Sequence, residues 1–354
     1  MTKSTISRRD LLRGSTALAA TSAFASVASA APPASAVTPQ LLAAAKKEGK
    51  VVYYTSIDLP VAERIAKAFE AKYPDIAVRV ERTGAERVFQ RIGQEYASGI
   101  HSVDVVNSSD AAHFIVWKRD GILEPYVPED VAKYYPAEHK DPDGVFATFR
   151  ATLCVIGYNT NMVKAEEAPK SYADLLDPKW VGKIVKAHPS YSGTIMTATY
   201  QMSRDLGWDY FEKLAKQKVL QVQSSADPPK KLALGERAVM ADGNEYNMFR
   251  EKEAGRPVEI VYASEGSPLI VGANGLFKHA PNPNAARLFQ SFCFSPAAQQ
   301  LIIDAGGLRS LHPQAKDKPG RKPFAEIKKM KDDAAAVEKT SEEIKAHYSR
   351  LFGV

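Results

Sequence analysis

The stretch Val51-Val52-Tyr53-Tyr54-Thr55-Ser56 begins the pattern that decides the fold, because it is a run of β-forming residues that ends in polar ones. An amphipathic helical pattern follows over residues 60–74. Alternation over 76–80 then predicts a second strand, helical spacing over 88–96 predicts a second helix, and residues 104–106 predict a third strand. Strands separated by helices of this length predict an α/β fold with a mainly parallel sheet and right-handed crossovers.

A second α/β unit follows along the chain, after an apolar run at residues 152–157. Its patterns predict strands over 182–186, 219–222, 238–240, 258–262 and 269–273, and helices over 194–206, over 283–294 and from Ser295-Pro296 onward. The lysine-rich tail, residues 320–354, has a helical period, and we expect a solvent-exposed outer helix there. The length of 354 residues exceeds the roughly 100–200 residues of one domain, so two lobes are expected.

Residues 1–36 are expected to be a targeting segment. Ser7-Arg8-Arg9-Asp10-Leu11-Leu12-Arg13 is a paired-arginine motif, and an alanine-rich, weakly hydrophobic stretch follows it. Ala28-Ser29-Ala30 and Ala34-Ser35-Ala36 offer two cleavage sites of the A-x-A kind. The stretch is too short and too polar to span a bilayer, and no later apolar run is long enough to do so. The segment therefore predicts export by the twin-arginine route to the periplasm.

The charge of the chain argues against nucleic acid as a partner. The formal net charge is +6, but residues 1–36 contribute four basic side chains and one acidic side chain. The remaining chain therefore has a net charge of +3, which is too small to indicate binding to nucleic acid or to an anionic membrane surface. We expect a monomer.

The only two cysteines, Cys154 and Cys293, both lie among apolar neighbours. Such surroundings are typical of small buried core residues. Two cysteines give no metal-binding spacing and no disulfide framework, and the sequence leaves open whether these two pair.

Four polar turns follow predicted strands. In an open α/β sheet, ligands bind beyond the carboxyl ends of the strands, so these turns are the candidate site. They are Thr55-Ser56-Ile57-Asp58, Ser108-Ser109-Asp110, Ser190-Tyr191-Ser192-Gly193-Thr194 and Ala241-Asp242-Gly243-Asn244-Glu245-Tyr246. Their hydroxyl, carboxylate and amide groups differ from the Gly- and Lys-rich pattern of nucleotide-binding loops.

Ser192-Gly193-Thr194 lies at the start of a predicted helix and is a candidate anion site. Free backbone N–H groups, two hydroxyl groups and the positive end of the helix dipole would hold an anion there. Serine and threonine are also ordinary N-caps, and Asp58 and Asp110 have the same alternative role.

Several ordered segments together resemble one known family. They are 51–56, Ala68-Phe69-Glu70, Tyr73-Pro74, 102–106, 157–160, 175–184, 283–289 and 295–299. In this order they resemble the family-1 extracellular solute-binding proteins, in the branch that holds the ferric-ion-binding periplasmic proteins. The resemblance covers nearly the whole chain after the targeting segment. It implies the solute-capturing subunit of an ABC importer, which delivers a small solute to a membrane permease.

The resemblance also implies a two-lobed periplasmic-binding-protein fold of type II. Each lobe is then a mixed, mainly parallel sheet flanked by helices, and a two-segment hinge joins the lobes and closes them on the ligand. The crossings are expected near residues 149–158 and 264–275. Lobe 1 would contain residues 37–150 and 275–320, lobe 2 residues 158–264, and a C-terminal helical segment residues 321–354.

The iron-binding members hold Fe(III) with an imidazole, a carboxylate, an adjacent tyrosine pair and a synergistic anion. On this chain the imidazole position matches Asp58, the carboxylate position matches Asp110 and the tyrosine pair matches Tyr246-Asn247. The second phenol and the imidazole are therefore missing. The anion site is kept at Ser192-Gly193-Thr194, and the resemblance implies Asn244 as its amide partner, with Gln223-Ser224 as a further contribution.

Several ligand classes remain open on these residues. Asp58, Asp110 and Tyr246 would give iron three oxygen ligands beside a chelating anion. Alternatively, Asp58 and Asp110 pair with a cation or hydroxyl groups of a small organic phosphate, phosphonate or carboxylate, which is the reading we favour; a polyamine or a sugar is a further option. The predicted ligand-binding set is Thr55, Ser56, Asp58, Ser109, Asp110, Ser192, Gly193, Thr194, Asn244, Tyr246 and Asn247, with Arg150 and Glu265-Gly266 as rim residues or salt-bridge partners.

An enzyme is the rival class. Asp58 with Asp110 would be an acid–base pair, or Ser192 a nucleophile. None of the four turns contains a histidine, and no Gly-x-Ser-x-Gly motif occurs. We therefore expect no catalysis and no cofactor; iron enters only as cargo.

Overall fold

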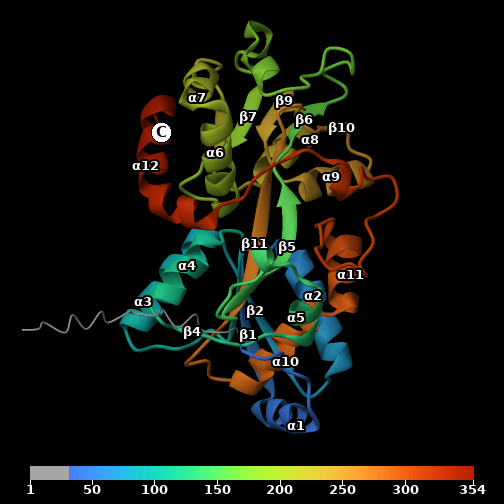
Figure 1. The fold of residues 1–354 in the computed structure, drawn as a ribbon. Helices are drawn as coiled ribbons and strands as arrows, with labels where there is room; N and C mark the ends of the chain where they lie inside the picture. Colours follow the sequence, from blue (N-terminus) through green and yellow to red (C-terminus); the bar gives the residue numbers. More distant parts are fainter. Residues whose placement is uncertain (1–31) are drawn as a thin grey trace, which may run out of the picture. The chain divides into compact units, whose positions relative to one another are not determined.

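The computed structural model describes residues 32–354, in which two β-sheets are flanked by helices (Figure 1). In the first sheet, the strands β1 (Lys50–Thr55), β2 (Ala77–Arg82) and β3 (Val105–Ser108) pair in parallel in the order β2-β1-β3. The long strand β11 (Ser267–Phe277) pairs antiparallel with β3. The predicted parallel pairing is therefore confirmed for the first three strands.

Three more strands pair with β11. The strand β5 (Phe146–Leu153) and the short β4 (Leu123–Glu124) run antiparallel to it, and the short β12 (Lys329–Met330) runs parallel to its first residues. The second sheet has the order β10-β6-β9-β7-β8. Its strands are β6 (Ile156–Asn159), β7 (Ile184–Ala187), β8 (Leu220–Val222), β9 (Val239–Asp242) and β10 (Val258–Val261).

Helices cover both sheets. We call the first sheet and its helices lobe 1; these helices are α1 (Pro39–Glu48), α2 (Leu59–Lys72), α3 (Ala85–Ala97), α4 (Ala112–Arg119), α5 (Glu129–Tyr134), α10 (Pro283–Phe294) and α11 (Pro296–Gly306). We call the second sheet and its helices lobe 2; these are α6 (Gly193–Leu206), α7 (Trp208–Ala215), α8 (Asp227–Ala233) and α9 (Glu245–Glu253). The last helix, α12 (Ala334–Phe352), contacts both lobes.

The local sequence explains where the helices begin and which face they bury. A proline in the first turn opens α2, and the Ser295 hydroxyl accepts a hydrogen bond from the Ala298 amide at the start of α11. Phe69 on the buried face of α2 meets Phe289 of α10 edge-on, with ring centroids 5.1 Å apart. Burying a side chain of this size contributes about 1.5–3 kcal/mol to the stability of the fold. This contribution favours a helix whose apolar residues all face the core.

The chain passes between the two sheets at β5 and β11, which lie side by side (Figure 1). Their register pairs Leu269 with Leu153 and Gly275 with Phe146, with an irregularity between Gly272 and Ala273. Both strands overlap the regions where the crossings were expected, near residues 149–158 and 264–275. The predicted run at 152–157 contains the end of β5 and the start of β6, and Cys154 and Val155 separate the two strands.

The expectation of a solvent-exposed C-terminal helix is wrong. Tyr348 is fully buried in the core of lobe 2, and its hydroxyl donates to the Gln221 side chain at 3.0 Å. Val337 and Ile344 of the same helix pack with Ala112 of α4 and Met196 of α6. The helix is amphipathic: Lys339 is exposed, whereas Lys345 is partly buried with its ammonium group 3.8 Å from the Glu86 carboxylate of α3, so composition alone gave the wrong environment.

Cys154 and Cys293 are buried free thiols in separate clusters, as expected of core residues. Within residues 32–354, no helix has the length and apolar content needed to cross a membrane. The paired-arginine motif and the first cleavage site lie outside the described residues, so export by the twin-arginine route stays a prediction.

Candidate functional site

A cavity of about 300 Å³ lies between residues of lobe 1 and residues of lobe 2. Most of its lining groups are hydroxyl, amide or guanidinium groups. From lobe 1 and β5 they are Ser56, Asp58, Arg82, Thr83, Gly84, Ala85, Glu86, Arg87, Gln90, Ser109 and Arg150; from lobe 2 they are Ser190, Tyr191, Ser192, Thr194, Gln223, Ser224, Ser225, Ala226, Asn244 and Tyr246.

Three helix N-termini reach this cavity. The N-cap residues of α3, α6 and α9, which are Gly84, Ser192 and Asn244, line it, each together with a residue of the first helical turn. The Ser192 hydroxyl accepts a hydrogen bond from the Ile195 amide at 3.4 Å, so it serves as the N-cap that the sequence also allowed. Because each helix N-terminus carries a partial positive charge, their convergence favours an anion in the cavity.

The Arg150 guanidinium adds a full positive charge to the cavity. Arg150 lies on β5 and is 3% exposed, and its hydrogen bond to a side chain is a long one of 3.4 Å from Nε to the Asn107 Oδ1 atom. No ion pair joins it to a carboxylate within 4 Å among the described residues. Burial lowers the pKa of the Arg150 guanidinium, as expected for a desolvated cation.

Gly272 on β11 leaves room for the Arg150 side chain. A Cβ atom at position 272 would lie 3.0 Å from both Cγ and Nε of Arg150. The glycine therefore allows the arginine to pass across the pair of crossing strands and to present its guanidinium group to the cavity.

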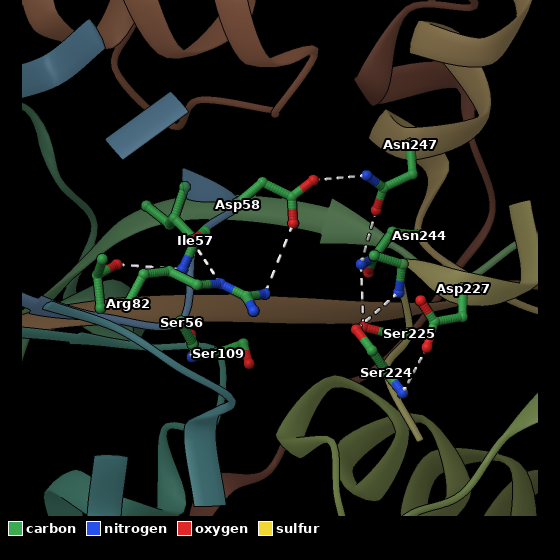
Figure 2. Close-up of polar contacts among 12 residues, drawn as sticks. Ser56, Ile57, Asp58, Arg82, Ser109, Ser224, Ser225, Asp227, Asn244 and Asn247 are labelled. Carbon is green, nitrogen blue, oxygen red and sulfur yellow. Dashed lines mark hydrogen bonds and ion pairs between the residues drawn. The ribbon is translucent and has the colours of Figure 1, made fainter. Parts of the chain in front are cut away.

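Asp58 connects the two lobes at the side of the cavity (Figure 2). Its Oδ2 atom accepts hydrogen bonds from Asn247 Nδ2 at 2.8 Å and from Arg250 Nη1 at 3.0 Å. The Tyr246 hydroxyl donates to Oδ1 at 3.3 Å, and the Arg82 guanidinium lies 3.7 Å from the same atom. Burial, followed by the Asp58 carboxylate, raises the pKa of the Tyr246 phenol.

Hydroxyl and amide groups complete the cavity wall. The Ser56 hydroxyl accepts a hydrogen bond from the Ser109 amide at 2.9 Å, which ties two of the predicted turns together. Asn244 Nδ2 donates to the Ser225 hydroxyl at 3.0 Å and to Asn247 Oδ1 at 3.1 Å (Figure 2). The arrangement presents many short polar groups to a polar solute.

The structure brings most of the predicted site residues to one cavity, together with Gln223, Ser224 and Arg150. The predicted residues at the cavity are Ser56, Asp58, Ser109, Ser192, Thr194, Asn244 and Tyr246. Asn247 lines a neighbouring cavity of about 570 Å³ instead. Glu265 lies away from both cavities, and its carboxylate accepts a hydrogen bond from the Ala173 amide.

Three further predicted residues line neither cavity. Thr55 is buried, and its hydroxyl accepts a hydrogen bond from the Ile57 amide, so it shapes the turn. Asp110 accepts a hydrogen bond from the Ala112 amide at 2.9 Å and lies 3.7 Å from the His113 ring, while burial raises the pKa of its carboxyl group. Gly193 packs directly against Asp110, as a Cβ atom there would lie 2.6 Å from the Asp110 Cβ atom.

Sequence reasoning missed the part of the cavity that β2 and α3 provide. Arg82 is the last residue of β2 and Thr83-Gly84 follows it, while Glu86, Arg87 and Gln90 lie on the first turns of α3. The signal was present, because these residues also follow the carboxyl end of a strand. They lacked the serine, aspartate and asparagine pattern used to select the other turns.

The three oxygen ligands suggested for iron do not lie together. Asp58 and Tyr246 are hydrogen-bonded to each other, but Asp110 lies outside the cavity beside His113. Within residues 32–354, no group of three or more histidine, cysteine, aspartate or glutamate side chains is arranged to hold a metal ion.

The family model of the bacterial extracellular solute-binding proteins matches residues 102–329. The chain belongs to this family. A relative from Haemophilus influenzae, an uncharacterised protein, is 26% identical to this chain over 276 residues. The matched region covers 74% of this chain and 78% of that protein.

Two solved structures have a fold similar to that of this solute-binding protein. The periplasmic binding protein AfuA from Actinobacillus pleuropneumoniae, with exogenous fructose-6-phosphate bound, is similar with a TM-score of 0.79 and 24% identity over 86% of this chain and 99% of that one. Iron-bound HitA from Pseudomonas aeruginosa is similar with a TM-score of 0.75 and 24% identity over 85% of this chain and 99% of that one. Both likenesses establish the two-lobed α/β fold, and the choice of solute rests on the residues of this chain.

Proposed function

We propose that this solute-binding protein is the capturing subunit of an ABC importer and that its solute is a small organic phosphate carrying hydroxyl groups. A phosphonate or carboxylate of similar size belongs to the same class of ligand. The protein would hold the solute between its lobes and deliver it to a membrane permease. AfuA, which is similar over nearly its whole length, has fructose-6-phosphate bound.

The observation that carries this proposal is the buried Arg150 guanidinium at the cavity, without a carboxylate partner within 4 Å among the described residues. A buried cation is costly unless it is paired, so a bound anion is the natural partner. A phosphate group would also accept hydrogen bonds from the N-termini of α3 and α6. The hydroxyl and amide groups around the cavity would then bind the hydroxyl groups of the solute.

A ferric ion is the less favoured cargo. Fe(III) would have to lie near Asp58, whose oxygens already accept hydrogen bonds from Asn247, Arg250 and Tyr246. Arg82 and Arg150 also line the same cavity, and two guanidinium groups repel a trivalent cation. The donor set suits an anion better than a metal ion.

Several finer features belong to the same proposal. We infer export by the twin-arginine route to the periplasm from residues 7–13, and a monomer that closes on its solute at β5 and β11. We also infer a binding role without catalysis; the family of solute-binding proteins supports it, as does a cavity whose polar groups are mostly hydroxyl groups, amides and arginines.

Titration calorimetry with a panel of solutes tests the proposal. We expect hexose monophosphates to bind and the matching unphosphorylated hexoses to bind far more weakly. Arg150→Met should lower the affinity for a hexose monophosphate by about 10- to 100-fold, because a charge-assisted hydrogen bond contributes about 1.5–3 kcal/mol.

The matched control is Arg79→Met, which removes an exposed arginine of lobe 1 that pairs with Glu81. This variant should bind like the parent protein. Equal affinity of the Arg150→Met variant and the parent protein, or equal binding of phosphorylated and unphosphorylated sugars, would contradict the proposal.

A further inference from the structure

Asp58 makes a set of polar contacts that cross from one lobe to the other. It lies at the start of α2 in lobe 1, whereas its partners Asn247 and Arg250 lie on α9 in lobe 2. Its side chain is only 13% exposed, and both carboxylate oxygens are engaged. The contact therefore joins the lobes within the protein itself.

The groups around Asp58 form an anion-binding site. One guanidinium group, one side-chain amide and one phenol donate hydrogen bonds to a single carboxylate, and the Arg82 guanidinium group lies 3.7 Å from it. Arg250 and Asn247 come from successive turns of one helix, and Arg82 closes the site from β2. Such a set of donors binds a carboxylate or a phosphate oxygen equally well.

Asp58 also lies at the border of two cavities. Asp58 and Arg82 line both the 300 Å³ cavity and the neighbouring 570 Å³ cavity, and Ser224 and Ala226 face both as well. Without the Asp58 carboxylate, the donors of Arg82, Asn247 and Arg250 would be open to a group of the solute.

We infer that Asp58 is a built-in anion that fills a second anion subsite of the cleft, formed by Arg82, Asn247 and Arg250. From this position it holds lobe 1 against α9. It also restricts the cleft to solutes that carry a single anionic group. A solute with two anionic groups would have to displace the carboxylate. This role goes beyond the proposed binding of an organic phosphate, because the partners of Asp58 in this contact are residues of the chain itself.

Chemical rescue with acetate tests the subsite directly. Asp58→Ala should lower the Tm of the solute-free protein by about 2–6 °C, because the buried Asn247 amide and the partly exposed guanidinium groups of Arg82 and Arg250 lose their common partner. Sodium acetate should restore at least half of this loss in the variant, relative to sodium chloride at equal ionic strength. The parent protein and Asp75→Ala, which removes an exposed carboxylate paired with Lys46, should show no such response. An acetate response of Asp58→Ala no larger than that of these controls overturns the inference.

A distance measurement covers the case in which Asp58→Ala does not fold. Spin labels on cysteines placed by Glu63→Cys on α2 and Glu212→Cys on α7 report the separation of the lobes. In the solute-free protein, Asp58→Asn should lengthen and broaden the distance distribution, since the charge is lost and the shape is kept. An unchanged distribution overturns the role of Asp58 in joining the lobes.

The selection of solutes is tested with a hexose bisphosphate. The Asp58→Ala variant should bind it at least 10-fold more tightly than the parent protein does, and no gain overturns the selective role. If no sugar phosphate binds either protein, the proposed function fails, while the acetate experiment still decides the existence of the subsite.

Discussion

Gly193 illustrates how a single residue limits the approach of the two lobes. The sequence suggested it as part of an anion site, but in the structure it packs against lobe 1. A Cβ atom there would lie 2.6 Å from the Asp110 Cβ atom and 3.1 Å from the Ala85 Cβ atom. Its backbone is at the first turn of α6, where alanine is intrinsically more favourable than glycine.

Gly193→Ala should therefore weaken solute binding. We expect at least a 10-fold loss of affinity in titration calorimetry, because the added methyl group keeps the lobes apart. The Tm without solute should fall by no more than about 6 °C, because separated lobes lose the contacts of Asp58 with α9 but keep the rest of the fold.

The control for this prediction is Gly93→Ala in α3, where no atom lies within 4 Å of the added Cβ atom. This variant should keep the affinity of the parent protein. Undiminished affinity of Gly193→Ala would show that the contact between Gly193 and Asp110 does not limit closure.

The candidate site was predictable to the extent that short polar turns follow strands. Ser56, Ser109, Ser192 and Asn244 were found in this way and do lie at one cavity. Asp110 has the same residue type and the same position after a strand, yet its side chain turns toward His113, because the start of α4 takes its carboxylate as a local hydrogen-bond acceptor. The position of a turn after a strand predicts at which edge of the sheet its residues lie, but it does not predict the direction in which each side chain points.

At the scale of elements, the helix α12 has a structural role that the amino-acid composition of the tail did not predict. Tyr348 fills the core of lobe 2, and Arg119 of α4 forms a 2.9 Å ion pair with Glu338 at the other end of the helix. A helix that packs on α4 and on α6 contacts both lobes, so its position depends on their arrangement. Because the tail is rich in lysine, its composition alone predicts an exposed helix and does not reveal the apolar residues that α12 buries.

Asp332, just before α12, gives this region a pH dependence. Burial, followed by the Asp110 carboxylate, raises the pKa of Asp332 to about 7. The folded protein thus holds a proton that the unfolded chain releases near its ordinary value of 3.8. Between these two values the folded state binds more protons, so the free energy of unfolding falls as the pH rises from about 4 to about 7 and levels off above that.

Asp332→Asn should remove this slope, which approaches about 1.4 kcal/mol per pH unit for one proton. Urea unfolding between pH 5 and pH 8 checks it, and the variant should be the more stable protein at the alkaline end. Asp304→Asn, at an exposed position beside Gln300, is the control and should keep the slope of the parent protein. A parent-like slope in Asp332→Asn would contradict the assignment.

The strands and long helices were predictable because each has one periodicity over its whole length. The predicted helix at 283–294 matches α10, and residues 194–206 lie within α6. Short elements such as β4 and β12 are two residues long and have no period of their own. They form because β11 offers them partners, which is a property of the fold and not of the local sequence.

At the scale of the whole molecule, a third chain segment accompanies the two crossing strands. After α11, Arg309 exchanges backbone hydrogen bonds with Ala151 on β5, and the chain then reaches β12. The guanidinium groups of Arg309 and Arg321 both pair with the buried Glu245 carboxylate at the start of α9. The helix that carries Tyr246 and Asn247 is thereby fixed to the crossing region.

This connection explains how a cleft between two lobes can hold its polar groups in place. The N-termini of α3, α6 and α9 and the Arg150 guanidinium all reach one cavity, although they come from four separate parts of the chain. Preorganised donors of this kind favour an anionic solute, since little ordering remains to be done on binding.

The most direct test of the account is to identify the solute that the protein carries. The protein is purified from its native compartment without added ligand, denatured, and the released small molecules are examined by phosphorus NMR and mass spectrometry. We predict a phosphomonoester bearing hydroxyl groups, close to one molecule per chain, which is lost from the Arg150→Met variant. Release of iron without any organic phosphate, phosphonate or carboxylate would contradict the account.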